Sequence, residues 1–397
     1  MKPLEGVTIA DFTVHAAGPF CTHMLSQLGA QCIKIESALR PDIFRKPHAV
    51  YGRNGPASFD QVASNKLSVR LNMKHPEGVA LAKRLVAVSD VAAESFRAGV
   101  MTRLGLGYAA LKEVKRDIVM VSVSSSGQTG PDSHFAGYAP LFGAWGGLGY
   151  LSGYSDGPPM EMRHVMDHSV GLNAALATVA ALHQRRRTGQ GSHVDVAARE
   201  VASSLVGDTL MSVSAGGHVE RLGNDDYRMS PHGLYPTDQP DRWLSIAVAS
   251  ECQWRALAEH AGLTHLLEDP RFSSPEPRHA NRRELDIALK EWSVVQNADA
   301  SAFALQRLGV PAHVSFNTRD LVHDHHLRER GAIVDVDGNE GERRAAVGFP
   351  ARFSVSEPAT IERGTPKLGE HESFVYGELL KMSQREIDGL VERQIIF

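Results

Sequence analysis

The sequence predicts an α/β fold with a mostly parallel β-sheet, helices on both faces of the sheet, and a second, smaller domain. Strand-like and helix-like segments alternate through the first third of the chain, which is typical of βαβ units. The chain has 397 residues, more than one hydrophobic core usually supports. A change of pattern at about residue 225 indicates where the second domain begins.

The first strands and helices are predicted from short apolar runs and from proline placement. The predicted helices cover about residues 19–28 and 76–88, and Pro76 suits the first turn of the second helix. Ligands of such sheets tend to bind beyond the carboxyl ends of the strands, so the turns that follow the strands are the first candidates for a site. The predicted strands are residues 7–10, 32–35, 68–71, 91–93 and 118–123.

The rest of the chain has a different pattern. Residues 243–248 form a good strand candidate, and helical stretches with proline-rich interruptions follow. From about residue 330 the sequence returns to strand-like segments such as 332–336, and it ends in an amphipathic helix near residues 384–393. The predicted divisions are residues 1–224, 225–325 and 326–397.

The composition excludes several classes of function. Hydrophobic residues make up 42% of the chain and charged residues 22%, as in ordinary globular proteins. A formal net charge of −4 gives no reason to expect nucleic acid as a partner. The three cysteines lack metal-type spacing and fit a reducing compartment. Without a secretory signal or a run of roughly 18 apolar residues, we expect a cytoplasmic protein that binds no membrane.

Several motifs are excluded by their context. The turn after the first predicted strand lacks G-x-G-x-x-G, which argues against a dinucleotide site. Residues 153–157 match G-x-S-x-G, but Pro158 and Pro159 follow where a hydrolase needs a helix. Residues 323–326 are His-Asp-His-His in a polar stretch without H-E-x-x-H spacing, so a solvated loop explains them better than a metal site. No metal site is predicted.

The segment 163–169 places a carboxylate, Asp167, at the start of an apolar helix. The apolar side chains of residues 170–182 are dense enough to predict a helix that is packed on most of its sides. Three arginines at 185–187 lie in the last turn of this predicted helix. At its N-terminus, the positive end of the helix dipole favours an ionised carboxylate. A nucleophile needs that ionised state, but a simple N-cap role of Asp167 or Ser169 accounts for the same position.

Short segments along nearly the whole chain form an ordered series. They lie at residues 3–36, 65–78, 94–108, 127–131, 187–196, 231–237 and 366–371. In content and order they resemble segments of the class III CoA-transferases, the CaiB/BaiF family that includes the formyl-CoA transferases. Each segment alone is weak, whereas six or more in the right order are strong support.

The resemblance implies a covalent mechanism. In this family the aspartate at the position of Asp167 attacks an acyl-CoA thioester and forms an aspartyl mixed anhydride. The released CoA thiolate then forms an aspartyl-CoA thioester, and an acceptor carboxylate is activated in turn. A covalent intermediate replaces one difficult step by several easier ones. The implied substrates are an acyl-CoA and a carboxylic acid; coenzyme A is a substrate, and no permanently bound cofactor is expected.

The resemblance also implies an architecture that periodicity does not reveal. A large Rossmann-like domain is built from both ends of the chain, so that residues 326–397 return to it, and a small domain is inserted at 225–325. Family members form intertwined dimers, and we therefore expect an intertwined homodimer.

Binding residues are carried over from the family position by position. Three positions of the chain differ from formyl-CoA transferases, which have glutamine at Ala16, arginine at Ser37 and asparagine at Ser95, so formate and oxalate are not expected to be the native pair. Arg40 and Arg97 are additional candidates for the phosphates, because arginine binds phosphate in a bidentate manner. The expected CoA-binding residues are His15, Ala16, Ala17, Arg40, Leu71, Met73, Lys74, Phe96, Arg97, Arg103 and Tyr138.

The acceptor site is predicted from cationic residues beside the nucleophile. Arg163, His164 and His168 flank Asp167 where formyl-CoA transferases have small neutral residues. One of them could hold the distal carboxylate of a dicarboxylic acid, or all three could support the loop or contact a second subunit.

Two other functions remain open. The α-methylacyl-CoA racemases have Gly-His-Asp where this chain reads Gly137-Tyr138-Ala139. Because proton exchange at the α-carbon needs a base on each face, the missing histidine favours a transferase, although Asp167 and Glu251 match racemase positions. A protein that only binds CoA is the third possibility, and the intact Asp167 argues against it.

Overall fold

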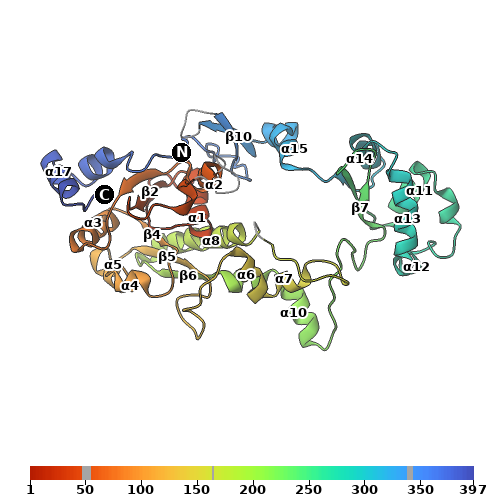
Figure 1. Ribbon diagram of the computed structural model, residues 1–397, viewed down its shortest axis with the longest axis horizontal. Coiled ribbons are helices and arrows are strands. Elements are labelled where there is room, and N and C mark those ends of the chain that lie inside the picture. The colour runs from red at the N-terminus through yellow and green to blue at the C-terminus, as the bar shows by residue number, and fades with distance from the viewer. Residues whose placement is uncertain (47–54, 163–164, 338–342) are drawn as a thin grey trace. The chain divides into compact units, whose positions relative to one another are not determined.

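The computed structural model describes residues 1–46, 55–162, 165–337 and 343–397 (Figure 1). The chain divides into two compact units, each treated by itself. Unit 1 comprises residues 1–150, 161–217 and 324–397, and unit 2 comprises residues 151–160 and 218–323. Both ends of the chain therefore build one unit, which confirms the predicted α/β architecture.

The boundaries of the inserted unit differ from the expected ones. The inserted unit runs from residue 218 to 323 rather than from 225 to 325, and it also includes residues 151–160. The cause is local hydrogen bonding: the amide of Gly223 donates to the carbonyl of Gly153 at 2.8 Å, and the Arg221 guanidinium donates to the carbonyl of Tyr154 at 3.1 Å. Two distant segments of the chain are tied together in this way.

A six-stranded parallel sheet forms the centre of unit 1. Its strand order is β3-β2-β1-β4-β5-β6, which reverses direction between β1 and β4. At such a point the loops that follow the two strands separate and leave a crevice. The strands are β1 (Thr8–Asp11), β2 (Gln31–Glu36), β3 (Leu67–Arg70), β4 (Val91–Glu94), β5 (Val119–Ser124) and β6 (His193–Ala197).

Helices cover both faces of this sheet, as predicted. On one face α1 (Ala17–Gln27) and α8 (Val165–Thr188) pack along each other and enclose an apolar core with β1, β4 and β5 (Figure 1). On the other face a second core is formed with α3 (Pro76–Ala87), α5 (Tyr108–Val114), the π-helical segment η3 (Ser373–Leu379) and α17 (Gln384–Glu392). The central strands are thus buried on both sides, which explains their continuous apolar character.

The end of the chain joins the sheet beside strands that lie far from it in sequence. The amide of Ala38 donates to the carbonyl of Phe397 at 3.0 Å, and the amide of Asn72 donates to the carbonyl of Ile395 at 2.8 Å. Ala38 and Asn72 follow β2 and β3, so the last residues lie at the carboxyl ends of these strands.

The five predicted strands and the helices over 19–28, 76–88 and 384–393 are present, with their ends shifted by at most two residues. Strand β6 was not predicted. It is an edge strand whose His193 and Asp195 are exposed while Val196 and Ala197 are buried, so it lacks the apolar run that marked the other strands.

Helix α8 differs from the prediction that it is packed on most of its sides. Leu172, Leu176 and Val179 are 45%, 70% and 36% exposed, and they form one apolar stripe, because they are spaced by four and three residues. Among the described helices α8 alone is long and apolar enough to cross a membrane by length and composition. Its opposite side packs on α1, β5 and β6, as expected of a helix that connects two strands of a sheet.

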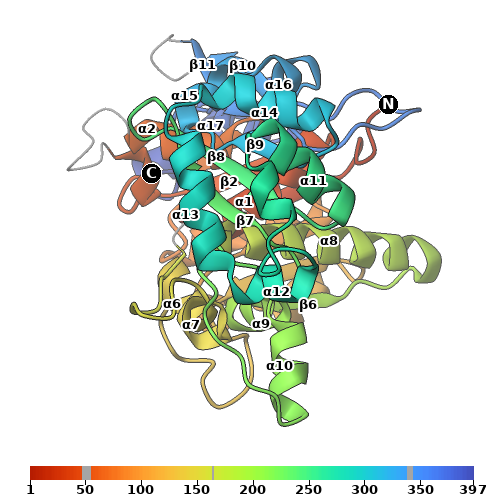
Figure 2. The same ribbon diagram turned by 90° about the vertical axis from the view of Figure 1, so that its right-hand side faces the viewer.

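Shorter elements complete unit 1. The hairpin β10–β11 lies beside α16 (Figure 2). The elements are η1 (Ile43–Arg45), α2 (Gly55–Ala63), α4 (Val100–Arg103), α6 (Ala139–Gly146), α7 (Leu148–Leu151), which ends at the unit boundary, α9 (Ala198–Ser204), α10 (Gly207–Ser214), α16 (His325–Glu329), β10 (Ile333–Asp337) and β11 (Arg343–Val347).

Unit 2 has its own core around an antiparallel three-stranded sheet of order β7-β8-β9. The predicted strand at 243–248 is β8. The buried Arg278 binds Glu251 and lies over the Trp254 ring at 5.3 Å. The elements are β7 (His232–Pro236), β8 (Trp243–Ala247), α11 (Glu251–His260), η2 (Thr264–Leu267), α12 (Pro275–Ala280), α13 (Arg282–Ser293), α14 (Ala298–Arg307), β9 (Ala312–Val314) and α15 (Thr318–His323).

Candidate active site at the carboxyl edge of the sheet

Asp167 lies at the carboxyl edge of the parallel sheet. Helix α8 connects β5 to β6 and therefore runs against the strands, so its first turn lies where the strands end. Gly171 contacts α1 so closely that a Cβ there would lie 2.7 Å from the carbonyl oxygen of Ala17. Asp167 lies one turn before Gly171 on the same side of α8, which directs it toward the turn between β1 and α1.

The structure corrects the N-cap interpretation of this segment. Helix α8 begins at Val165, so Asp167 is its third residue and Ser169 its fifth. Neither residue is the N-cap. An acidic side chain in the first turn interacts favourably with the helix dipole, which stabilises the carboxylate form.

The β1–α1 turn is held in an unusual backbone conformation. His15 has a φ of 67°, in the left-handed region that non-glycine residues rarely adopt. The amide of Val14 donates to Ser95 Oγ at 2.9 Å, and Ser95 Oγ donates to the carbonyl of Val14 at 3.0 Å. Gly18 permits this contact, because a Cβ there would lie 2.7 Å from that of Ser95. The turn is thus fastened to the loop after β4.

Two buried lysines bind the β1–α1 turn and its neighbours from the interior of the protein. Lys66 Nζ donates to Asp11 Oδ2 at 2.9 Å and to the carbonyl of Pro19 at 2.9 Å. Lys34 Nζ donates to the carbonyl of Thr13 at 3.0 Å. Both lysine side chains are fully buried, as is that of Asp11. Burial by itself would raise the pKa of Asp11, but the two lysines outweigh burial and lower it, so the network is charged.

Aromatic contacts gather further predicted residues at this edge. The rings of His15 and Tyr138 meet edge to face at 6.2 Å, and those of Phe20 and His168 do so at 4.5 Å. His15 is exposed and Tyr138 is 67% exposed. Since Ala17 contacts α8, the structure brings Asp167, His168 and the 15–17 turn into one neighbourhood, and Tyr138 reaches it through His15.

The next group of predicted CoA contacts follows β2 and β3 at the same edge. Arg40, Met73 and Lys74 lie in the turns after these strands, and Arg40 and Lys74 are exposed. Leu71, which lies between Arg70 and Met73, has a different environment. It is fully buried in the core, because it directly follows the interior strand position, so only its main chain could reach a ligand.

The last group lies in the loop after β4 and in α4. Phe96 packs partly against the core, while Arg97 and Arg103 are exposed. Gly99 has a φ of 77°, and a Cβ there would lie 3.2 Å from Arg103 Nη1. The glycine therefore serves both the sharp turn and the close approach of the arginine. Arg163 and His164, the remaining predicted acceptor contacts, lie outside the described residues.

Sequence reasoning missed a polar cluster on the adjoining part of this edge. Glu94 is 2% exposed. Its burial raises its pKa to about 7, against the effect of hydrogen bonds from Ser122 and the Phe96 amide. The buried hydroxyls of Ser124 and Ser126 have no hydrogen-bond partner within the described parts of the chain, which is rare for buried polar groups unless a ligand or water satisfies them. Glu94 is the first residue of the family-like segment 94–108, and this position was the only signal in the sequence.

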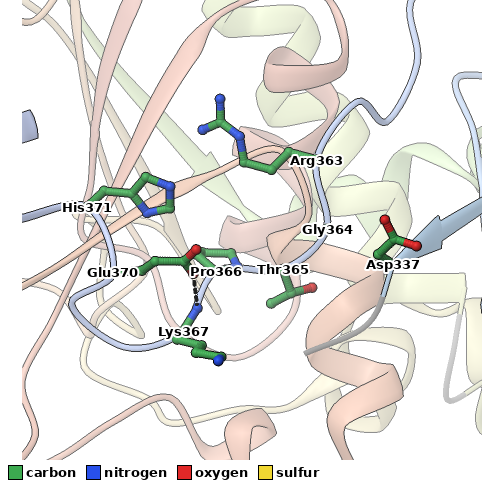
Figure 3. Close-up of a pocket in the computed structure, with 8 residues that line it drawn as sticks. All are labelled: Asp337, Arg363, Gly364, Thr365, Pro366, Lys367, Glu370 and His371. Atoms are coloured by element: carbon green, nitrogen blue, oxygen red, sulfur yellow. Dashed lines mark hydrogen bonds between the residues drawn. The ribbon is translucent and has the colours of Figure 1, made fainter. Parts of the chain in front are cut away.

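Two hollows in unit 1 lie elsewhere. One, of about 200 Å³, is lined by residues 363–367, Glu370, His371 and Asp337 (Figure 3). Glu370 turns toward Lys367 and accepts its amide hydrogen at 2.6 Å (Figure 3). The other, of about 610 Å³, lies at the opposite, amino edge of the sheet, with Gln31 and Leu67 in its wall. Asp167 lines neither hollow. Within the described ranges no group of three or more His, Cys, Asp or Glu residues could hold a metal ion.

Comparison with known proteins identifies the family. The sequence model of CoA-transferase family III matches residues 4–372. The chain belongs to CoA-transferase family III. The resemblance that the sequence segments predicted is thereby confirmed, and the protein is a class III CoA-transferase.

Full-length relatives of the family agree with this assignment. The chain is 32% identical over 400 residues to the succinyl-CoA–D-citramalate CoA-transferase of Chloroflexus aurantiacus, covering 100% of this chain and 98% of that protein. It is 31% identical over 385 residues to the succinate–glutarate CoA-transferase of Agrobacterium fabrum, covering 95% and 96%. A crystal structure of a CaiB/BaiF family protein from Brucella suis matches with a TM-score of 0.86 at 28% identity, covering 95% of this chain and 99% of that one.

Proposed function

We propose that this CoA-transferase moves coenzyme A through covalent intermediates on Asp167. The observation that carries the proposal is the position of Asp167 in the first turn of α8, at the carboxyl edge of the sheet and beside the β1–α1 turn. The helix dipole there favours the carboxylate, which is the nucleophilic form.

The proposed steps conserve the thioester bond energy. The Asp167 carboxylate attacks the acyl carbonyl and expels the CoA thiolate, which gives a mixed anhydride. The thiolate then attacks the aspartyl carbonyl and releases the donor acid, which leaves an aspartyl-CoA thioester. The acceptor carboxylate attacks that thioester and expels the thiolate again. Finally, the thiolate attacks the acceptor's carbonyl, which gives the new acyl-CoA and restores Asp167.

The surroundings suit a large anionic ligand. Arg40, Lys74, Arg97 and Arg103 lie in turns or a short helix that follow β2, β3 and β4, and all four side chains are exposed. The net charge of the chain is negative, so a local group of cations is what would attract the phosphates of CoA. Tyr138, in place of the racemase histidine, leaves the racemase alternative without its second base.

The test of this mechanism is Asp167→Ala, with Asp167→Asn as a second variant that keeps the shape of the side chain. Both should lose transfer from succinyl-CoA by several orders of magnitude while CoA binding in calorimetry and the thermal unfolding curve stay near wild type. The reason is that only the covalent step is removed. Near wild-type transfer in Asp167→Ala would refute the role of Asp167.

We further propose a dicarboxylic acid as the acceptor. Two relatives that match nearly the whole chain are named for succinyl-CoA with D-citramalate and for succinate with glutarate. This chain carries Arg163 four residues before Asp167, and a fixed cation would bind and orient a distal carboxylate.

A panel of acceptors with succinyl-CoA as donor tests this second proposal. Glutarate and related diacids should be used in preference to monocarboxylates of the same length, and Arg163→Gln should reduce that preference roughly tenfold or more, the usual effect of losing one charge-assisted hydrogen bond. Arg40→Gln serves as a control that weakens CoA binding without changing the preference. Equal use of monocarboxylates would contradict the proposal and leave the family assignment intact.

We also propose that the active protein is an intertwined homodimer. The stripe of Leu172, Leu176 and Val179 on α8 is apolar and exposed in the single chain, and Leu210 and Met211 of α10 are 60% and 70% exposed. Exposed apolar surface of this kind is typical of an interface between subunits.

A further inference from the structure

Three polar residues lie side by side across the carboxyl end of the sheet. Glu94 of β4 pairs with Ser122 of β5, and Ser122 pairs with Asp195 of β6, so all three side chains share one face. The Ser122 hydroxyl hydrogen-bonds Glu94, and His193 Nε2 lies 2.9 Å from Ser122 Oγ. This face is the one that does not contact α8.

Gln128, in the loop after β5, joins the two ends of this row. Its main-chain amide donates to Asp195 Oδ2 at 2.8 Å, and its Nε2 donates to Glu94 Oε1 at 3.4 Å. Its Oε1 accepts the amide hydrogen of Gly99 at 3.4 Å. The side chain of Gln128 thus connects β4 to the loop that follows it, and its main chain binds β6.

Glu94 holds the other end of that loop. Its Oε2 accepts the amide hydrogen of Phe96 at 2.7 Å. The loop of residues 95–99 is therefore fixed at Phe96 by Glu94 and at Gly99 by Gln128. The same loop presents Phe96 and Arg97, leads into α4 with Arg103, and contacts the β1–α1 turn through Ser95.

We propose that Glu94 and Gln128 are positioning residues for coenzyme A, which hold the 95–99 loop in the shape that receives the ligand. Neither side chain needs to touch the ligand for this role. The inference rests on the proposed function, because it takes the 95–99 loop as part of the CoA site.

The clamp requires Glu94 as a carboxylate, since both of its oxygens accept hydrogen from N–H donors. Burial raises the pKa of Glu94 to about 7, and Asp195 adds to the effect, while Ser122 and the Phe96 amide oppose it. The other ionisable groups on this face are His193, Tyr108 stacked on it at 5.3 Å, and Lys112 over Tyr108. Below about pH 7 the clamp therefore loses an acceptor, and the binding of CoA should weaken.

The experiment compares Glu94→Gln, Gln128→Glu and the exchange of the two in Glu94→Gln/Gln128→Glu, using the full-length enzyme. Glu94→Gln replaces one of the two acceptor oxygens by an NH2 group, which cannot accept a hydrogen bond from the Phe96 amide or from Gln128. Gln128→Glu removes the NH2 donor and places a second carboxylate beside that of Glu94. Each should raise KM for succinyl-CoA roughly tenfold while kcat changes little. The exchange restores one carboxylate and one amide and should recover most of the lost affinity. Glu113→Gln, on the exposed side of α5, is the matched control and should behave as wild type.

A pH series completes the test. Wild-type KM should rise as the pH falls through about 7, and this rise should be absent in Glu94→Gln. If Glu94→Gln does not fold, Gln128→Glu and the exchange carry the test, because Gln128 is half-buried. The proposal is wrong if the exchange is no better than the single variants, or if both single variants keep the wild-type KM. A wild-type enzyme that does not bind CoA in calorimetry would instead overturn the proposed function.

Discussion

Asp11 and Glu94 end neighbouring strands, and their surroundings move their pKa values in opposite directions. Asp11 is matched by Lys66 and Lys34, which lower its pKa despite burial. Glu94 has hydrogen-bond donors but, among the described residues, no ion-pair partner, and burial raises its pKa to about 7. The first group stabilises the fold as an ion, whereas the second ionises only as the pH rises through about 7, and its ionisation costs stability.

A prediction at the residue scale follows from the raised pKa of Glu94. A folded-state pKa above the ordinary value of 4.5 gives stability that is complete below that value and is lost as the pH rises to about 7. Between these values wild type should therefore lose about 3 kcal/mol of unfolding free energy relative to Glu94→Gln. Denaturant unfolding of both proteins at about pH 5 and pH 8 measures the difference, and parallel pH dependences of the two would contradict it.

Some site residues could be identified from the sequence, and others only from the structure. His15 was found because it lies in a segment that resembles the family, and Asp167 and Tyr138 were carried over from family positions; the structure places all three at one edge. The partnership of Glu94 with Gln128 depends on strand register and on the fold of two loops. Since the residues lie 34 positions apart, no local pattern could pair them.

At the scale of elements, the strands that are buried on both faces were predictable because burial demands continuous apolar runs. Edge strand β6 was not predicted, because its exposed half carries polar residues and lacks an apolar run. Helix α8 was predicted to be more buried than it is, since composition alone cannot distinguish a leucine that faces the core from one that is exposed. Its exposed stripe is the physical basis for the proposed dimer.

The α8 stripe gives a prediction for assembly. Wild type should scatter light as a dimer at micromolar concentration and should not dissociate on dilution. Leu176→Glu should destabilise the dimer strongly, because a charge would be buried among apolar side chains. Val295→Glu, at a site in unit 2 that is 71% exposed against 70% for Leu176, should leave the dimer unchanged. A monomeric wild type would contradict the proposed assembly.

At the scale of the molecule, the sequence predicted an α/β unit with an inserted second unit, and the family match supports the activity. The association of residues 151–160 with residues 218–224, which sets the boundary of unit 2, could not be predicted from the sequence. It depends on hydrogen bonds to main-chain carbonyls between turns that are distant in the chain. The β1–α1 turn, the start of α8 and the loop after β4 converge at one edge only because the parallel sheet aligns their ends.

Chemical trapping of the covalent intermediate tests whether Asp167 is the nucleophile. The enzyme is incubated with succinyl-CoA, treated with hydroxylamine or borohydride, digested and analysed by mass spectrometry. We expect a modification of the Asp167 side chain, a hydroxamate or a reduced alcohol, that requires the acyl-CoA and is absent in Asp167→Ala. An active enzyme in which Asp167 stays unmodified while another residue is labelled would contradict this expectation.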